Sequence, residues 1–419
     1  MNPDRIRRSK IRYDSVERKI RNLTELQKLV DLPKESDLTS RQWESINTQL
    51  TVLKEQLLTK LNKQARKYMP YLQSFKAIKR FNDALAALEM EFTYNALPVF
   101  DIFLKICVQR STIKIGKLLA GCDAIAFDAL NRDHPALKII EPPITYIEGK
   151  AGAAMLPERA PLIEGAINPV PLIQIPFQRL MTKAHLISAG HEIAHEMDQR
   201  LGLSQLMRRI VVEKLTKVGA PDEVKSLNYV WMTEEIPDFI SWCLFGEAHS
   251  YSMMEINLIP KDRIFFIESG GPHPPGWYRV LMTFEWCHQE WGDAGRWMQA
   301  KDEFKQLYPL DGANSYEREI LAECEKYLPI VCKIMRKIKL AVLNGRTIPE
   351  LFEVSLLSPQ RIEKICKSAD SGNLNLKNLR PCLQLAVLRK LFDTRKDITE
   401  LASDQISEEW LMRVGNKRI

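Results

Sequence analysis

The sequence predicts a predominantly helical α+β protein. Leu, Ile and Val recur at three- and four-residue spacing through most of residues 14–131, and the C-terminal part of the chain shows a helical pattern again. Between these parts, the stretch after Asp133 is rich in proline and glycine and holds two short β-like runs. We therefore predict a helical N-terminal region at 1–135, a mixed region with a small sheet at 136–290, and a helical C-terminal region at 291–419.

The N-terminal region begins with two long amphipathic segments, residues 14–32 and 40–67, joined by the loop LPKESD. Thr39 and Ser40 are candidate N-caps for the second segment. Pro70 and Pro98 should break or bend the helices that follow. Helices of this kind form either a bundle or an arm that binds a protein partner, and the pattern alone leaves both open.

The middle region predicts two strands, ITYIEG at 144–149 and PLIQIP at 171–176. A helix should begin near Arg179 and another should cover about 234–246, followed by the loop IESGGPHPPGW. The chain is then helical to its end, with breaks near Pro309, at 347–349, and at 372–373.

Composition and length are those of an ordinary soluble globular protein. Of the 419 residues, 45% are hydrophobic and 27% are charged. The first residues, MNPDRIRRSKIR, are basic and no apolar segment follows them, so we expect no signal peptide. No stretch approaches the roughly 18–20 apolar residues of a membrane span. The eight cysteines form no C-x-x-C pair, which indicates reduced, buried thiols in a cytoplasmic protein.

The net charge of +7 is mild for this length. The basic cluster near the N-terminus comprises Arg5, Arg7, Arg8, Lys10 and Arg12. Such a cluster can contact nucleic acid or an acidic partner, but a solvated arm is the favoured interpretation. We find no zinc-finger spacing, no helix-turn-helix pattern and no interleaving of aromatic with basic residues, so we expect no nucleic acid among the partners.

The segment His191-Glu192-Ile193-Ala194-His195 is the strongest candidate for chemistry. A chance H-E-x-x-H in a chain with so few histidines has odds on the order of one in a hundred. Residues four apart share one face of a helix, so both imidazoles can reach one zinc ion at about 2.0–2.1 Å. Glu192 is rotated by about 100° from His191, which suits a general base better than a ligand. The alternative is a pair of ordinary buried histidines with backbone partners.

A catalytic zinc needs a third protein ligand. Positions 198 and 201 are Asp and Leu, so no third histidine follows at the spacing of other H-E-x-x-H enzymes. Glu234 can serve instead, while Asp238 accepts the free ring N–H of a ligating histidine. The same acids also suit the first turn of a helix capped by Thr233, and Glu235 competes with Glu234 for the metal.

These elements together resemble the gluzincin metallopeptidases, and most closely the family of the CaaX prenyl protease and the bacterial protease HtpX. The segment HPPGWYR supplies His273 and Arg279 at the spacing of that family's His-Pro and arginine element. The resemblance covers about residues 138–290. It implies a cleft with PLIQIP as its upper edge, His191, His195 and Glu234 as ligands of one zinc ion, and Asp238 behind them. It also implies Glu192 as base and His273 with Arg279 near the developing oxyanion.

Two departures from the family matter. Its alanine before the supporting aspartate is Pro237 here, and a proline suits a helix start better than a helix interior. Its best-known members are embedded in membranes, and this chain predicts no membrane span, so their substrates cannot be carried over.

We therefore expect a soluble zinc-dependent endopeptidase, with an extended peptide substrate pairing with PLIQIP as an edge strand. The alternative is a non-catalytic, zinc-containing helical scaffold that binds partner proteins. The intact Glu192 favours the enzyme, because a structural zinc site needs no base. A weaker possibility is a protease that regulates a nucleic-acid-bound repressor, for which the N-terminal basic cluster is the only support.

Overall fold

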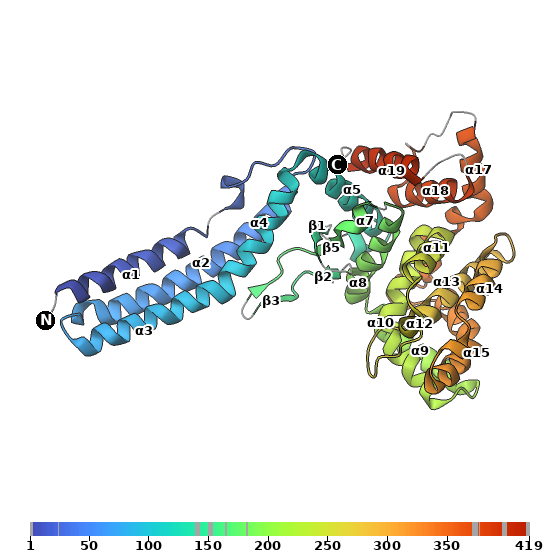
Figure 1. Ribbon diagram of the computed structural model, residues 1–419, viewed down its shortest axis with the longest axis horizontal. Coiled ribbons are helices and arrows are strands. Elements are labelled where there is room, and N and C mark those ends of the chain that lie inside the picture. Colours follow the sequence, from blue (N-terminus) through green and yellow to red (C-terminus); the bar gives the residue numbers. More distant parts are fainter. Residues whose placement is uncertain are drawn as a thin grey trace. The chain divides into compact units, whose positions relative to one another are not determined.

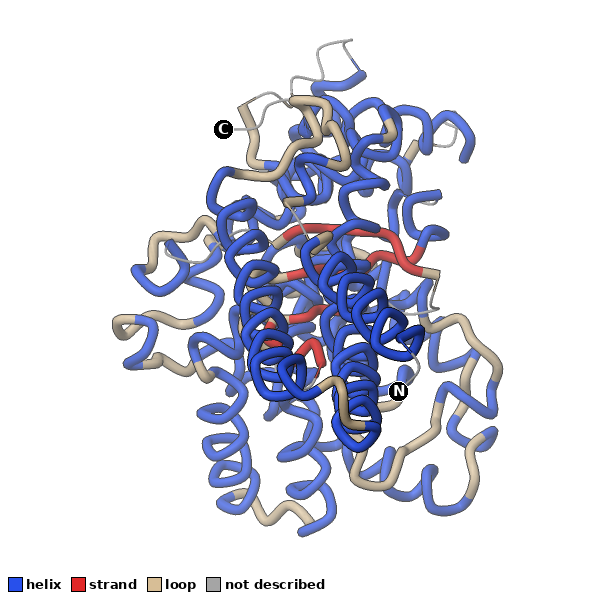
Figure 2. The backbone as a smooth tube through the Cα atoms, turned by 90° about the vertical axis from the view of Figure 1, so that its left-hand side faces the viewer, coloured by secondary structure: helices blue, strands red, loops and turns tan. Residues whose placement is uncertain are grey.

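The computed structural model in Figure 1 describes residues 3–23, 25–138, 143–149, 154–163, 166–181, 183–370, 376, 378–395 and 400–415. Helices dominate, and a three-stranded and a two-stranded sheet complete the described part, which confirms the predicted α+β class. Figure 2 shows how few strands lie among the helices. None of the described helices is both long and apolar enough to cross a membrane.

The chain forms two compact units. Unit 1 comprises Met1–Ala120, Ile144–Ile147 and Leu156–Leu172, and unit 2 comprises Gly121–Pro143, Glu148–Met155 and Ile173–Ile419. Unit 2 thus contains both the H-E-x-x-H motif and the residues of the predicted C-terminal helical region.

Unit 1 is built on a helical bundle whose long members are α1 (Pro3–Arg21), α2 (Ser40–Tyr68), α3 (Phe75–Glu91) and α4 (Leu97–Ser111). A 3₁₀ turn (Leu26–Lys28) precedes α2, a second one (Met69–Tyr71) joins α2 to α3, and a π-helix (Phe92–Ala96) joins α3 to α4. In Figure 1, α1, α2 and α3 lie side by side. These helices therefore form a bundle with a shared core.

Local signals in unit 1 explain where its helices begin and end. Thr39 caps α2, because its hydroxyl accepts a hydrogen bond from the Gln42 backbone N–H at 3.1 Å while the Gln42 side chain accepts one from the Thr39 N–H at 2.8 Å. Pro70 lies in the 3₁₀ turn that ends α2, and Pro98 lies in the first turn of α4. The predicted helix at 14–32 is wrong in its bounds, since α1 ends at Arg21.

The core of the bundle is the apolar stripe that the sequence predicts. Leu57 and Leu61 of α2 pack with Phe81 and Leu85 of α3 and Ile20 of α1 in one buried cluster. The opposite face of each helix carries charged side chains in contact with water. Burial of this stripe, at about 25 cal/mol per Å² of apolar surface, is the main stabilising contribution in unit 1.

The strands are β1 (Ile144–Glu148), β2 (Ala154–Leu156), β3 (Pro161–Ile163), β4 (Ala166–Ile167) and β5 (Leu172–Pro176). β3 and β4 pair antiparallel, with Pro161 opposite Ile167. The other three form a sheet in the order β1-β5-β2. Both predicted strands are confirmed as β1 and β5. The prediction that PLIQIP is an edge strand is wrong, because β5 is the central strand and all of its residues are buried.

Helices make up almost all of the described part of unit 2. They are α6 (Pro135–Lys138), α7 (Phe177–Met181), α8 (Ala189–Leu201), α9 (Leu203–Lys217), α10 (Asp222–Phe245), α11 (Glu247–Ile256), α12 (Lys261–Ile264), α13 (Gly276–Trp291), α14 (Trp297–Leu307), α15 (Ser315–Lys337), α16 (Ile348–Phe352), α17 (Pro359–Asp370), α18 (Pro381–Thr394) and α19 (Glu400–Gly415). α5 (Ile113–Leu130) contributes residues to both units.

Breaks predicted in the C-terminal region are largely confirmed. α14 ends at Leu307, just before Pro309, and Thr347 forms a capping box with Glu350 at the start of α16. The break predicted at 372–373 lies outside the described residues. All eight cysteines are buried thiols outside any disulfide, as the sequence predicts.

Helix bounds around the motif differ from prediction. The single helix expected from Arg179 is three pieces: α7, a 3₁₀ segment (Lys183–Ser188) and α8. The helix expected to begin near residue 234 begins at Asp222. Thr233 is therefore not an N-cap, and its hydroxyl donates to the Val230 carbonyl at 3.0 Å. Pro237 lies inside α10, so the expectation that it marks a helix start is also wrong.

Candidate metal centre

The two motif histidines lie one turn apart on α8, which packs against α10. Gly190 makes this close approach possible. A Cβ atom at position 190 would lie 2.5 Å from Cε2 of Phe245 and 2.8 Å from Oγ of Ser241, both on α10. The glycine directly before His191 therefore sets how near the histidines come to the carboxylates of α10.

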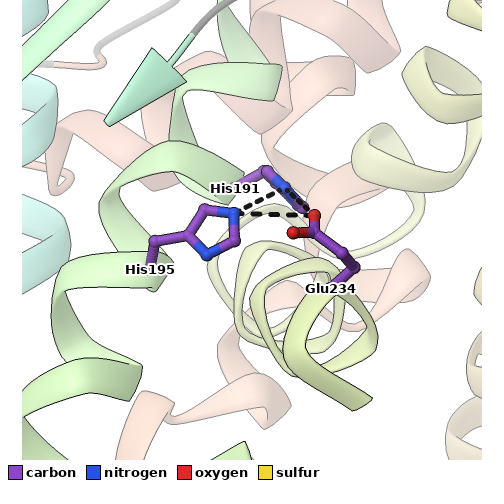
Figure 3. A group of neighbouring side chains, drawn as sticks. All are labelled: His191, His195 and Glu234. Carbon is purple, nitrogen blue, oxygen red and sulfur yellow. Dashed lines mark hydrogen bonds and ion pairs between the residues drawn. The ribbon is translucent and has the colours of Figure 1, made fainter. Parts of the chain in front are cut away.

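Three side chains converge on one point between these helices (Figure 3). Nε2 of His191 lies 3.1 Å from Nε2 of His195 and 3.2 Å from Oε2 of Glu234. The distance from Nε2 of His195 to the same Glu234 oxygen is 3.6 Å. All ligand atoms of the group lie within 4.8 Å of one another. Two nitrogens and one carboxylate oxygen thus form a small triangle that could hold a metal ion.

Asp238 contacts Nδ1 of His191, the ring nitrogen that does not take part in the cluster. Its Oδ1 lies 2.7 Å from Nδ1 of His191, and its two oxygens accept hydrogen bonds from Nη2 and Nε of Arg279 at 2.8 and 2.7 Å. With Nδ1–H donating to this carboxylate, it is Nε2, facing Glu234 and His195, that would give up its proton and offer a lone pair to a metal ion. The order Arg279, Asp238, His191 therefore fixes the orientation of the ring and the nitrogen that would bind a metal.

The buried carboxylates of the site favour the binding of a cation. Burial opposes charge on His191, but the carboxylates of Asp238 and Glu234 outweigh it and raise the pKa of the ring to about 9. Burial likewise opposes ionisation of Glu234, yet hydrogen bonds from His191, His195 and His273 hold its pKa well below the usual range. Arg279 and His191 keep the pKa of Asp238 low against the same cost of burial. The buried carboxylates thus stay ionised and favour positive charge at the histidine nitrogens.

Glu192 lies beside this triangle without belonging to it. It lines a cavity of about 200 Å³ together with His191, Glu234, His249, His273, Ser252, Met253, Ile256, Ser188, Arg179 and Arg279. Burial lowers the pKa of Arg179, and the nearby charge of Glu192 partly offsets this. Glu192 therefore shares the cavity with two guanidinium groups, those of Arg179 and Arg279.

His273 and Arg279 reach the site in different ways. Nδ1 of His273 lies 3.3 Å from Oε2 of Glu234, and 60% of its side chain remains exposed, so it stands at the open side of the cluster. Arg279 uses two guanidinium nitrogens for Asp238. Its position therefore suits holding Asp238 as well as it suits the predicted contact with an oxyanion.

Glu235 points elsewhere. The residue is 1% exposed, neither of its oxygens has a hydrogen-bond partner among the described residues, and it is not in the cluster of possible ligands found there. Burial, aided by the charge of Asp238, raises its pKa well above the usual range. Of the two neighbouring glutamates, only Glu234 is placed beside the histidines.

Of the cavity residues that sequence reasoning missed, two are basic side chains, Arg179 and His249. Arg179 comes from α7, and a 3₁₀ segment separates it from the motif helix, so no helical spacing links it to Glu192. His249 comes from α11, where its Nδ1 lies 3.0 Å from Oγ of Ser241 and burial lowers its pKa to about 4. Its place in the segment EAHS has no pattern that would have marked it.

Comparisons with known proteins add no family to this description. No protein-family model matches the chain, and neither the curated proteins nor the solved structures contain a match. What the site can do is therefore argued from its own residues.

Proposed function

We propose that this protein is a zinc-dependent endopeptidase. One observation carries the proposal: His191, His195 and Glu234 converge within 4.8 Å, with Glu192 beside them at the wall of the same cavity. This is the arrangement that the resemblance to the gluzincins implies, and it arises from two helices that are far apart in the sequence.

The donor set fits zinc. Two imidazole nitrogens and one carboxylate are a common ligand set of catalytic zinc sites, which keep a fourth position for water or substrate. Ligand atoms about 2.0–2.1 Å from a tetrahedral zinc ion lie about 3.3 Å apart, and the three separations here are 3.1, 3.2 and 3.6 Å. The Asp238 contact to His191 adds the outer hydrogen bond that ligating histidines usually make.

Bound zinc would polarise the scissile carbonyl and make a water molecule more acidic. Glu192 would take a proton from the attacking water and pass it to the leaving amine. His273, at the exposed side of the cluster, would donate to the oxygen that gains negative charge. For Arg279 the structure supports a second role beside the predicted one, namely holding Asp238 against His191.

The test combines metal analysis with digestion of a peptide library by wild type and by Glu192→Gln. We expect one zinc ion per chain in both proteins and cleavage by wild type alone, since a general base is worth about 10²–10⁴-fold in rate. Glu213→Gln, at the exposed surface of α9, is the matched control and should cleave like wild type. His273→Ala should lower kcat by about 10²–10³-fold with less change in KM.

Different outcomes separate the alternatives. Wild type that neither contains nor takes up zinc would refute the enzyme. Zinc bound without cleavage of any peptide would favour the non-catalytic scaffold. Cleavage by Glu192→Gln at the wild-type rate would remove Glu192 from the mechanism.

A further inference from the structure

One end of the helical bundle in unit 1 has a charge and surface unlike the rest of the chain. There the 3₁₀ turn Met69–Tyr71 joins α2 to α3, and α1 begins. We call residues 5–12 and 60–80 the bundle tip (Figure 1). The two segments lie against each other, because the guanidinium of Arg5 covers the ring of Phe75 at 5.3 Å and Nδ2 of Asn82 donates to Oγ of Ser9 at 2.8 Å.

The bundle tip contains no acidic residue, and Asp4, next to it in the first turn of α1, is the acid beside it in the sequence. Residues 60–80 include seven Lys or Arg and no Asp or Glu, and residues 5–12 include five Lys or Arg and no Asp or Glu. The whole chain has a net charge of +7, so without these twelve charges it would carry −5. The basic surplus of the protein is therefore concentrated at this one place.

These charges are available to solvent. The basic side chains of residues 60–80 are all exposed: Lys60, Lys63, Arg66, Lys67, Lys76, Lys79 and Arg80. Glu91 and Glu89, farther along α3, pair with Lys60 and Arg12. The basic residues nearer the turn therefore keep a strong positive potential at the tip.

Two large aromatic side chains are exposed among these basic side chains. Tyr71 is 64% exposed and Phe75 is 61% exposed, and Pro70 beside them is exposed as well. Tyr71 ends the turn and Phe75 begins α3, between Lys67 and Lys76 in the sequence. Basic and aromatic residues are therefore interleaved in this segment, and the expectation that the chain has no such interleaving is wrong. Exposed aromatics that protrude from a basic surface are typical of segments that enter the interface of a membrane.

We propose that the bundle tip docks on the surface of a membrane that contains anionic phospholipids. Tyr71 and Phe75 would enter the headgroup layer, while the long Lys and Arg side chains around them contact lipid phosphates and keep their charged ends in water. A membrane fits better than nucleic acid, since stacking on bases uses ring faces and one face of Phe75 is already covered by Arg5. This docking does not depend on the proposed peptidase activity.

The test is sedimentation of the full-length protein with phosphatidylcholine vesicles, with and without phosphatidylserine. We expect binding only when phosphatidylserine is present, and weaker binding as salt is added. The variant Arg66→Glu/Lys67→Glu/Lys79→Glu should bind at least about 100-fold more weakly, at about fivefold for each basic residue. Tyr71→Ser/Phe75→Ser should weaken binding about tenfold. Thermal unfolding should match wild type, since these side chains are exposed.

Matched controls lie elsewhere on the chain. Tyr94, near the other end of α3, is 67% exposed, so Tyr94→Ser removes an equally exposed ring. Lys333→Glu/Lys337→Glu/Lys339→Glu makes the same change in net charge within unit 2. Both controls should bind like wild type. The proposal would be overturned if wild type bound both kinds of vesicle equally or bound neither. It would also be overturned if the tip variants and the control variants lost binding equally. Tip-dependent binding to an oligonucleotide without binding to vesicles would overturn it as well.

Discussion

Helices α2 and α10 differ in how they use charged residues. α2 buries one apolar stripe and leaves its charged side chains in water, where a charge needs no partner within the protein. In α10 every residue from Glu234 to Phe245 is buried, including three carboxyl groups. A carboxylate removed from water must gain partners or a proton. The exposed charges of α2 are therefore available to contact other molecules, whereas each buried acid of α10 needs a partner or a proton within the protein.

The three acids of α10 meet that requirement differently. Glu234 faces three histidines, and Asp238 faces His191 and Arg279, so both remain ionised. Glu235 has no hydrogen-bond partner in the part of the chain that the structure describes, and its raised pKa favours the neutral form. Neighbours in the sequence thus have opposite electrostatic roles, and the following experiments test that contrast.

The largest expected effect concerns Glu234. Glu234→Ala removes a proposed zinc ligand, and zinc affinity can be measured by competition with a chelator. Loss of a residue that only hydrogen-bonds to a zinc ligand typically lowers affinity by about 10–100-fold, and we expect a larger loss here. Glu235→Ala should leave zinc affinity nearly unchanged. If Glu235→Ala loses zinc while Glu234→Ala keeps it, the ligand is Glu235 and the contrast between the two acids is reversed.

Asp238 should affect both metal and stability. Asp238→Ala leaves the guanidinium of Arg279 and the ring of His191 without their partner, which should cost about 3–5 kcal/mol in the free energy of unfolding. Zinc affinity should fall by about 10–100-fold. Asp83→Ala, at an exposed site on α3, is the matched control and should stay within about 0.5 kcal/mol of wild type. Equal effects of the two changes in urea unfolding would contradict the buried network.

Gly190 tests the approach of α8 to α10. Gly190→Ala places a methyl group 2.5 Å from Cε2 of Phe245, so the helices must move apart, at a cost of about 1–3 kcal/mol in stability and with weaker zinc binding. Gly149→Ala is the control, because its Cβ would meet nothing within 4 Å. Wild-type stability and zinc affinity in Gly190→Ala would show that close helix packing does not position the histidines.

The smallest expected effect lies in unit 1. Glu89 pairs with Lys19 and with Arg12, and the hydrogen bond from Lys19 lowers its pKa below 4.5 against the cost of burial. A lowered folded-state pKa contributes stability that is present above pH 4.5 and lost as pH falls through the folded value. Because the pair is partly exposed, Glu89→Gln should cost less than about 1 kcal/mol near neutral pH. That cost should shrink toward zero in acid; a constant cost at every pH would exclude the ion pair as its source.

Features that depend on residues close together in the chain could be predicted from the sequence. The fold class, the bundle helix α2 with its Thr39 cap, both predicted strands and the pairing of His191 with His195 on one helix face all follow from spacing within a few residues. Such patterns indicate the local backbone preference and which face of a helix or strand is buried. Both depend on nearby residues and not on distant segments of the chain.

Contacts between segments that are distant in the sequence could not be predicted in this way and depend on packing. The tertiary structure selected Glu234 over Glu235 beside the histidines, because α10 begins at Asp222 and continues through Pro237, so the rotation of the helix depends on packing along its whole length. It made β5 the central strand, since pairing with two neighbours is not encoded within PLIQIP. Arg179 and His249 joined the cavity for the same reason. Local patterns carry no information about these contacts, which arise when buried surfaces find one packed arrangement.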